Sequence, residues 1–264
     1  MSTRINKGEL QNFAQALCLQ EMPLAVFSTD EKPSSGFTPG QGWKFQCVVS
    51  CIRLARKKRT ASYFSRGQNF CPGGMLYTNV IDEIPEFIAP YVSTGIPGVL
   101  DGERYCRTPE IVQRFLEAVK LPPDPLTYRV FKPIEKLTEG ETPELVIFYA
   151  RPEILSGLYT LVQYYTGGLN SVITPWGAGC TALYTWVKKY MLQGKEIAVL
   201  GGFDVTARPH MELEELTLSM PYNMFLEILK CYKESFIFTK SWPLVKRRIG
   251  KSQSLFETEQ DSNK

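Results

Sequence analysis

The pattern of apolar and polar positions along the chain predicts alternating helices and strands. Apolar residues recur at helical spacing in several segments, namely 5–18, 43–58, 108–120, 151–164, 181–192 and 221–236. Short apolar runs predict strands at 24–28, 61–65, 126–132, 145–150, 170–174 and 197–200, with an extended segment at 215–220. Because the strands are short and the loops between them are rich in proline, we expect an α+β fold, a mixed sheet with packed helices.

Two parts of the chain show a weak similarity to each other. In each part a helix begins at a cysteine, Cys47 or Cys180, becomes basic, and is followed by a strand that ends in glycine. Strand-like runs precede the two units at 24–28 and 170–174. Either a duplication or chance explains this pattern. A duplication would place the two cysteines opposite each other across a pseudo-twofold axis.

The composition is that of an ordinary globular protein. Of the 264 residues, 44% are hydrophobic and 22% are charged, which is enough apolar material for one large core. We predict a single α+β domain over residues 1–249, which a duplication would divide into halves 20–130 and 143–240. The polar residues 250–264 are predicted to be a disordered tail.

Charge and hydropathy argue against several classes of partner. The formal net charge of +3 is too small to indicate nucleic acid. The basic run at 53–59 has few aromatic residues around it, so we expect it to be the solvated face of a helix. No run approaches the roughly 18 consecutive apolar residues of a membrane span, and the first residues lack the apolar core of a signal peptide. We therefore expect a soluble, cytoplasmic protein.

The cysteine and histidine content narrows the chemistry. Seven cysteines in a chain without a signal peptide indicate a reducing compartment, where cysteines are buried, metal-bound or reactive rather than disulfide-bonded. The one histidine, His210, argues against a zinc enzyme with several histidine ligands and against most histidine-based acid–base schemes. We expect His210 to lie in a surface loop.

Four cysteines form the candidate chemical site. Cys47 and Cys51 lie one helical turn apart and share a face. Cys71 opens the sequence Cys-Pro-Gly-Gly, which predicts a turn whose Gly73 and Gly74 direct backbone N–H groups toward an anion. Cys180 follows a run of small residues.

Together these cysteines predict a [4Fe–4S] cluster, because four thiolates near amide donors and positive charge suit such a cluster. Arg53 and Arg56 would supply that charge. Zinc is the alternative metal, since four thiolates suit it too. The metal-free alternatives are buried core cysteines and a reactive Cys71, for which no nearby histidine partner is evident.

Other polar and aromatic residues leave alternatives open. The glycine pairs at 167–168, 177/179 and 201–202 belong to no complete phosphate-binding fingerprint, so we expect turns. Asp204 and Arg208 either line a site near the last pair or form a local salt bridge. Five aromatic residues are predicted to lie in the core, with a pocket wall as the alternative: Tyr164, Tyr165, Trp176, Tyr184 and Trp186.

Several of these motifs together resemble the family called domain of unknown function 169, or ArCR, of archaea and anaerobic bacteria. The resemblance spans most of residues 8–236. It is carried by the strand at 23–27, Trp43, Arg53-Leu-Ala-Arg56, the Cys-Pro-Gly-Gly at 71–74, Cys180 and the segment 215–221. Members of the family carry one cysteine in the first of these helices, so the resemblance does not decide between Cys47 and Cys51. It implies no particular activity.

The sequence therefore predicts a protein that binds an iron–sulfur cluster or soft metal at the seam between two similar halves. The ligands would be Cys51, Cys71, Cys180 and Cys47, and the cluster would transfer electrons or bind a small ligand. The alternatives are a metal-free protein that holds a small anion with its glycine turns and Arg53/Arg56, and a thiol enzyme. A redox partner, a small-molecule ligand and a homo-oligomer all remain open.

Overall fold

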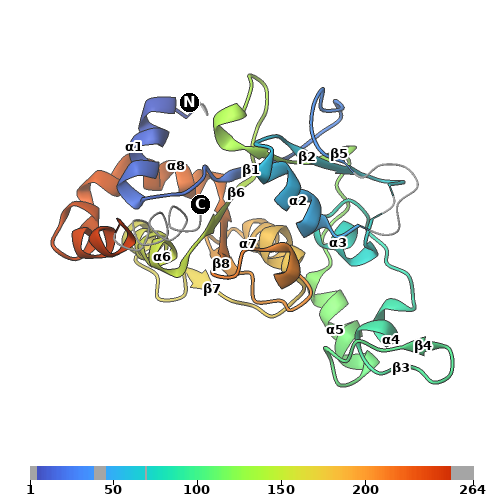
Figure 1. The fold of residues 1–264 in the computed structure, drawn as a ribbon. Helices are drawn as coiled ribbons and strands as arrows, with labels where there is room; N and C mark the ends of the chain where they lie inside the picture. The colour runs from blue at the N-terminus through green and yellow to red at the C-terminus, as the bar shows by residue number, and fades with distance from the viewer. Residues whose placement is uncertain (1–4, 39–45, 69, 251–264) are drawn as a thin grey trace, which may run out of the picture.

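The computed structural model describes residues 5–38, 46–68 and 70–250. Within these residues, seven strands form one mixed sheet in the order β2–β5–β1–β6–β9–β8–β7 (Figure 1). The strands are β1 (Leu24–Thr29), β2 (Ser62–Ser65), β5 (Tyr128–Pro133), β6 (Leu145–Ala150), β7 (Val172–Ile173), β8 (Ala198–Gly201) and β9 (Leu216–Pro221). Neighbouring strands are antiparallel except β7 and β8. The predicted α+β fold is confirmed.

Helices cover both faces of this sheet because its central strands are apolar on both sides. All six residues of β6 are buried, and the period of two sends alternate side chains to opposite faces. Leu145, Ile147 and Tyr149 join one core cluster, and Val146, Phe148 and Ala150 join the other.

Each face has its own set of helices. On one face lie α1 (Lys7–Leu17), α6 (Pro152–Thr166) and α8 (Tyr222–Cys231), which Figure 1 shows at the left of the sheet. Phe13 of α1 packs edge-to-face on Phe225 at a ring-centroid distance of 5.6 Å. The other face carries α2 (Val48–Lys57), α3 (Pro72–Tyr77) and α7 (Trp186–Leu192), with the π-helical turn Thr181–Thr185 directly before α7.

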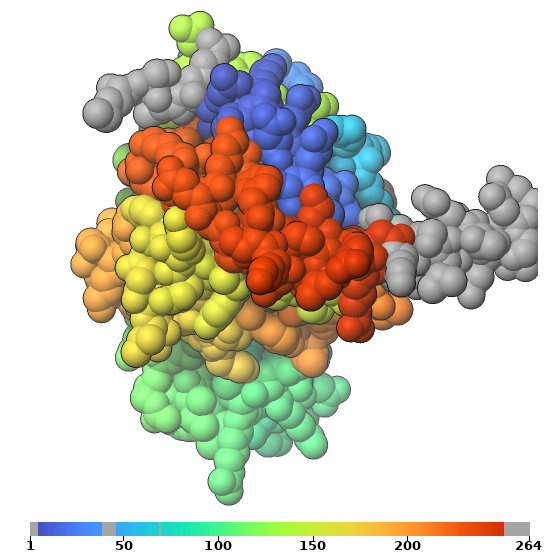
Figure 2. Space-filling model, turned by 90° about the vertical axis from the view of Figure 1, so that its left-hand side faces the viewer, coloured from blue at the N-terminus to red at the C-terminus, as the bar shows by residue number. Residues whose placement is uncertain are grey.

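A small lobe projects from the second face. It consists of α4 (Ile88–Val92), β3 (Gly95–Ile96), β4 (Leu100–Asp101) and α5 (Pro109–Val119). The pair β3–β4 is separate from the main sheet. Figure 1 shows this lobe at the lower right, and Figure 2 shows it protruding below the rest of the molecule. Short 3₁₀ turns at 134–136, 208–210, 232–234 and 236–238 and helical residues 241–250 complete the described chain.

The prediction of a turn at the Cys-Pro-Gly-Gly sequence was wrong. Pro72 begins α3, and Gly73 and Gly74 lie inside that helix. Proline favours the first turn of a helix because its φ is already helical. At Gly74 a Cβ would lie 2.7 Å from Val48 Cγ2, so glycine allows α3 to approach α2 closely. These glycines are therefore packing residues of a helix rather than parts of a turn.

Two of the predictions concern residues that the structure does not describe. Trp43, part of the resemblance, and the tail beyond Gly250 lie outside the described residues. Helix α2 begins at Val48 within the predicted segment 43–58. In the described ranges, no helix has both the length and the apolar character needed to cross a membrane.

Candidate ligand-binding site

A cavity of about 580 Å³ lies between the lobe and the second face of the sheet. This volume is in the range of about 300–1,000 Å³ that is typical of small-molecule sites. Four parts of the chain line it: α3, the lobe, the loop at 174–179 and the segment 200–206. Its aromatic wall consists of Tyr77, Tyr91, Tyr105, Phe115, Trp176 and Phe203.

Glu103 organises the wall that the lobe contributes. Its Oε1 accepts a hydrogen bond from the Tyr91 hydroxyl at 3.1 Å, and its Oε2 accepts one from the Tyr105 hydroxyl at 3.0 Å. Burial and these bonds raise the pKa of Tyr91, and they raise the pKa of Tyr105 to about 12. Both phenols therefore stay protonated at neutral pH, and their rings are oriented around one carboxylate.

Phe115 of α5 joins the lobe to the body of the protein. Its ring packs edge-to-face on Trp176 at a centroid distance of 4.9 Å and on Tyr77 at 5.9 Å. Such aromatic pairs contribute about 0.5–1.5 kcal/mol each beyond their buried area. Trp176 nevertheless remains 56% exposed, so the indole has free surface at the cavity.

Asp204 is held in place in another part of the lining. Its Oδ2 accepts hydrogen bonds from the Gly179 amide at 2.6 Å and from the Thr206 hydroxyl at 2.5 Å. Gly179 is required for this approach, because a Cβ there would lie 2.6 Å from the Ala207 Cβ. Arg208 does not pair with Asp204 in the described part of the chain. Its guanidinium donates instead to backbone carbonyls, including those of Gly202 and Glu215.

The lining of the cavity is acidic. Among the described residues that line it, Glu103 and Asp204 are the carboxylates, and none is a lysine, arginine or histidine. Within the described ranges neither carboxylate forms an ion pair. A cavity lined by charge of one sign concentrates ions of the opposite sign.

Three of the four candidate cysteines come from separate elements that meet near Asp204. Cys47 precedes α2, Cys71 precedes α3 and lines the cavity, and Cys180 precedes the π-helical turn. Burial raises the pKa of Cys180 well above its ordinary value, and negative charge on Cys47, Cys71 and Asp204 adds to this effect. Burial likewise raises the pKa of Cys47.

No group of three or more Cys, His, Asp or Glu side chains is spaced to hold a metal ion in the part of the chain that the structure describes. The fourth candidate, Cys51, lies in the core, where its thiol donates to Gln46 Oε1 at 3.4 Å. Burial raises the pKa of Cys51 to about 12, with a smaller contribution from Cys47.

The two candidate arginines are paired with carboxylates away from the cavity lining. Arg53 Nη2 lies 3.1 Å from Glu212 Oε1. Arg56 donates from Nε to Glu21 Oε1 at 2.6 Å and from Nη1 to Glu215 Oε2 at 2.9 Å, and it stacks on Tyr149. Gly73 lines the cavity, whereas Gly74 is buried against Val48. The roles predicted for these residues in cofactor binding stay predictions.

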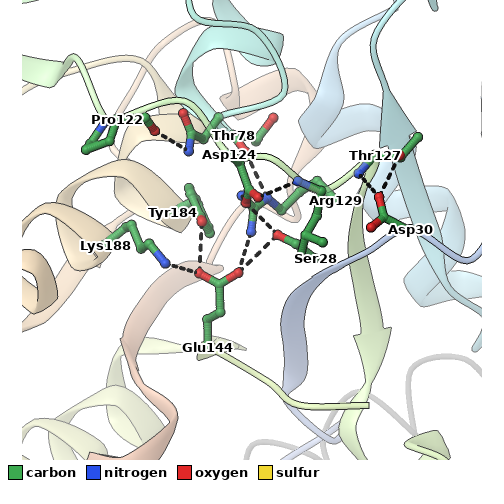
Figure 3. A network of polar contacts seen from close by, with 12 residues as sticks. Ser28, Asp30, Thr78, Pro122, Asp124, Thr127, Arg129, Glu144, Tyr184 and Lys188 are labelled. Atoms are coloured by element: carbon green, nitrogen blue, oxygen red, sulfur yellow. Dashed lines mark hydrogen bonds and ion pairs between the residues drawn. The ribbon is translucent and has the colours of Figure 1, made fainter. Parts of the chain in front are cut away.

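A second polar cluster, the Arg129 network, is buried on the same face of the sheet (Figure 3). Arg129 is 3% exposed and donates to Asp124 Oδ2 at 2.5 Å and to Glu144 Oε1 at 2.7 Å. Glu144 Oε2 accepts from Tyr184 at 3.0 Å and from Lys188 at 2.5 Å. Two cations therefore meet two carboxylates, so this network is electrically complete.

Sequence reasoning missed most of the residues that form the cavity wall. Tyr91, Glu103 and Phe115 belong to no motif and were not singled out from the sequence. Trp176 was placed in the core, with a pocket wall as the alternative, and it lines the cavity. For Asp204 the alternatives were a site near the glycine pair 201–202 or a salt bridge with Arg208. Its position after that glycine pair was the sequence signal for a site. His210 lies in the surface turn at 208–210.

Comparison with known proteins gives one match. No curated protein and no solved structure shows significant similarity to the chain. The family model of DUF169, described as uncharacterised ArCR, matches residues 12–230. This range includes the whole sheet, the lobe and every residue of the cavity wall. Because the match covers most of its length, the chain belongs to the DUF169 family.

Proposed function

We propose that the protein binds a small, largely apolar molecule in the cavity between the lobe and the sheet. The observation that carries this proposal is the aromatic wall around a volume of about 580 Å³. Exposed aromatic faces such as that of Trp176 lose contact with water when a ligand stacks on them, which favours binding. The fixed carboxylates of Glu103 and Asp204 supply polar contacts that orient the ligand.

The cavity supports a neutral or positively charged ligand better than the small anion that was one alternative. Arg53 and Arg56 were expected to hold that anion, and both are engaged by carboxylates. An anion in the cavity would face Glu103 and Asp204 without a compensating cation from the described lining residues. Repulsion between like charges in a partly desolvated site opposes such binding.

Ligand-observed NMR with benzyl alcohol, indole and benzylamine tests this proposal. We expect saturation transfer from the protein to at least one of these compounds. Ala178→Trp, which fills the cavity from its wall, should abolish the transfer. Leu169→Trp adds the same ring at a side chain that is 92% exposed elsewhere on the surface and should change nothing. Equal transfer to both variants, or none to the wild type, would contradict a binding cavity.

A soft-metal or iron–sulfur site remains the second candidate. The specific observation in its favour is that, besides burial, the negative charge of Cys71 raises the pKa of both Cys47 and Cys180, so the three thiols lie close together. Nearby negative charge disfavours the thiolate form of a cysteine, and a bound metal cation offsets this effect and favours deprotonation. Cys51 would be the fourth ligand only after its side chain left Gln46.

Anaerobic purification with a visible spectrum and iron, sulfide and zinc analysis tests the second candidate. A brown protein with about four iron atoms per chain would indicate a [4Fe–4S] cluster. Iron should be lost in Cys71→Ala and retained in Cys231→Ala, a matched control on the other face of the sheet. Zinc without iron would indicate the alternative metal. A protein without metal after reconstitution would refute both metals.

The strand order supports two similar halves around the proposed seam. On one side of the central pair β1–β6 the order is β1–β5–β2, and on the other side it is β6–β9–β8. In both triplets the strand latest in the sequence lies between the other two. Cys47 and Cys180 precede the helical segments that lead to β2 and β8, respectively. The seven cysteines are free, which supports the proposed cytoplasmic location.

A further inference from the structure

We propose that the ligand of this cavity is a small organic cation, a quaternary ammonium group or a protonated amine on an apolar body. This inference rests on the proposed ligand-binding function and specifies its ligand class. It is carried by two features of the same cavity, namely carboxylates that form no ion pair with the described residues and an aromatic wall.

The first feature is negative charge, on two parts of the cavity lining, that no described lining residue compensates. Glu103 accepts hydrogen bonds from two neutral phenols, and Asp204 accepts them from an amide and a hydroxyl. Besides burial and Glu103, the charge of Asp204 raises the pKa of Tyr105. The two carboxylates therefore act on the same side chain, so a ligand beside Tyr105 experiences both of them.

The second feature is the type of surface between the carboxylates. The faces of Trp, Tyr and Phe rings carry negative electrostatic potential, and cages of such rings bind quaternary ammonium groups. Tyr91 and Tyr105 both donate to Glu103, and Trp176, which is partly exposed, lines the same cavity from the loop at 174–179. Aromatic rings also keep an apolar ligand body out of water, which a cavity lined with carboxylates alone would not do.

Three buried or partly buried carboxylates elsewhere in the described chain show how an arginine of the chain can balance such a charge. The partly buried carboxylates of Glu144, Asp124 and Glu215 each meet an arginine of the chain itself. Glu103 and Asp204 differ because no described residue supplies a cation to them. A cation from outside the chain would complete their electrostatics as Arg129 completes those of Asp124 and Glu144.

Three ligands of one shape and different charge provide the test. Choline carries a positive charge, 3,3-dimethylbutan-1-ol is its neutral counterpart, and 3,3-dimethylbutanoate is negative. Isothermal titration of the full chain should give choline an affinity about tenfold higher than that of the neutral alcohol, which corresponds to about 1.4 kcal/mol. The carboxylate should bind more weakly than either.

Two pairs of substitutions locate the source of the preference for choline. Glu103→Gln keeps an amide that can hydrogen-bond to both tyrosines but removes the charge, so the preference for choline should fall several-fold. Glu117→Gln removes an exposed carboxylate on α5 that does not line the cavity, and it should leave the preference unchanged. Trp176→Leu should weaken choline binding, and Trp176→Phe should restore part of it.

The outcomes separate this inference from the function on which it rests. If the neutral alcohol or the carboxylate binds as tightly as choline, the cation inference is overturned and the binding cavity stands. If choline does not bind while benzyl alcohol does, the inference is likewise overturned. If none of these compounds binds, the proposed function fails as well. A preference for choline that survives Glu103→Gln unchanged would also contradict the inference.

Discussion

The Arg129 network and the ligand-binding cavity both place carboxylates on the same face of the sheet, but they differ in charge balance. In the network, Asp124 and Glu144 meet Arg129 and Lys188, and every charge has a partner (Figure 3). In the cavity, Glu103 and Asp204 meet only neutral donors from the described residues. A buried carboxylate that is paired with a cation of the same chain contributes to the stability of the fold. A carboxylate at a cavity that has no such cation can bind a cationic ligand.

Removal of the central cation should give the largest effect. Arg129→Ala leaves Asp124 and Glu144 in a partly buried site without their main partner, so we expect a loss of about 3–5 kcal/mol in the free energy of unfolding. Urea unfolding followed by circular dichroism measures it. Arg66→Ala breaks an exposed pair with Asp82 and should cost at most about 1 kcal/mol. Similar losses for the two variants would mean that the network does not stabilise the fold.

A methyl group at the contact between α2 and α3 should give the next largest effect. Gly74→Ala brings a Cβ to within 2.7 Å of Val48 Cγ2, and overpacking of this kind costs about 1–3 kcal/mol. The double variant Gly74→Ala/Val48→Ala removes the clash and should lose less stability than the sum of the two single variants. Strict additivity of the losses, measured by urea unfolding, would show that the two residues are not in contact.

Acid should weaken the Arg129 network. Burial by itself raises the pKa of Glu144, but Arg129 and Lys188 outweigh it and hold the pKa below the ordinary 4.5. The pKa of Asp124 is also lowered from 3.8, because hydrogen bonds and Arg129 outweigh its burial. The stabilisation is therefore complete above these ordinary values and is lost as the pH falls through them toward the lower folded values.

The free energy of unfolding, measured from pH 7 to pH 3, should thus decline below about pH 4.5. Glu144→Gln should make this decline shallower, because one of the two linked carboxyls is gone. Glu139→Gln, at an exposed loop position, should keep the slope of the wild type. An unchanged slope in Glu144→Gln would mean that Glu144 is not held in its charged form by the network.

The smallest expected effect is a difference between Cys71 and Cys180 in the rate of alkylation, which does not involve a loss of stability. Cys71 lines the cavity and is partly exposed, whereas Cys180 is buried and its pKa is raised well above the ordinary value. Iodoacetamide at pH 8, followed by peptide mass spectrometry, should modify Cys71 at least about tenfold faster than Cys180, because the accessible thiolate is the reactive species. Ala178→Trp should slow Cys71 alone. Equal rates at both cysteines would contradict the burial of Cys180.

The sequence predicted the parts of the fold that depend on local pattern. The apolar run at 145–150 is buried on both faces as β6, and the helix predicted at 108–120 is α5. Cys-Pro-Gly-Gly was misread because glycines favour turns locally, whereas here the packing of α3 against α2 requires the absence of a Cβ at Gly74. A tertiary contact of this kind leaves no mark in the spacing of apolar residues.

The candidate site was predicted less completely for a related reason. The sequence does not distinguish Arg56 and Arg129 from arginines that bind a ligand. Only the fold shows that Arg56 is already paired with Glu215 and Arg129 with Glu144. The cavity wall combines Tyr91 of the lobe with Trp176 of a loop far along the chain. Such residues share no motif, because long-range packing alone brings them together.

Hydrogen exchange of the full chain, with and without the tighter of choline and benzyl alcohol, tests the central claim most directly. The account predicts that the ligand slows amide exchange in segments 88–106, 174–182 and 200–206, which contribute to the cavity walls. It also predicts no change in segments 124–133 and 144–150, which carry Asp124, Arg129 and Glu144. Slower exchange at the network without slower exchange at the cavity walls would contradict the claim that the cavity is the binding site.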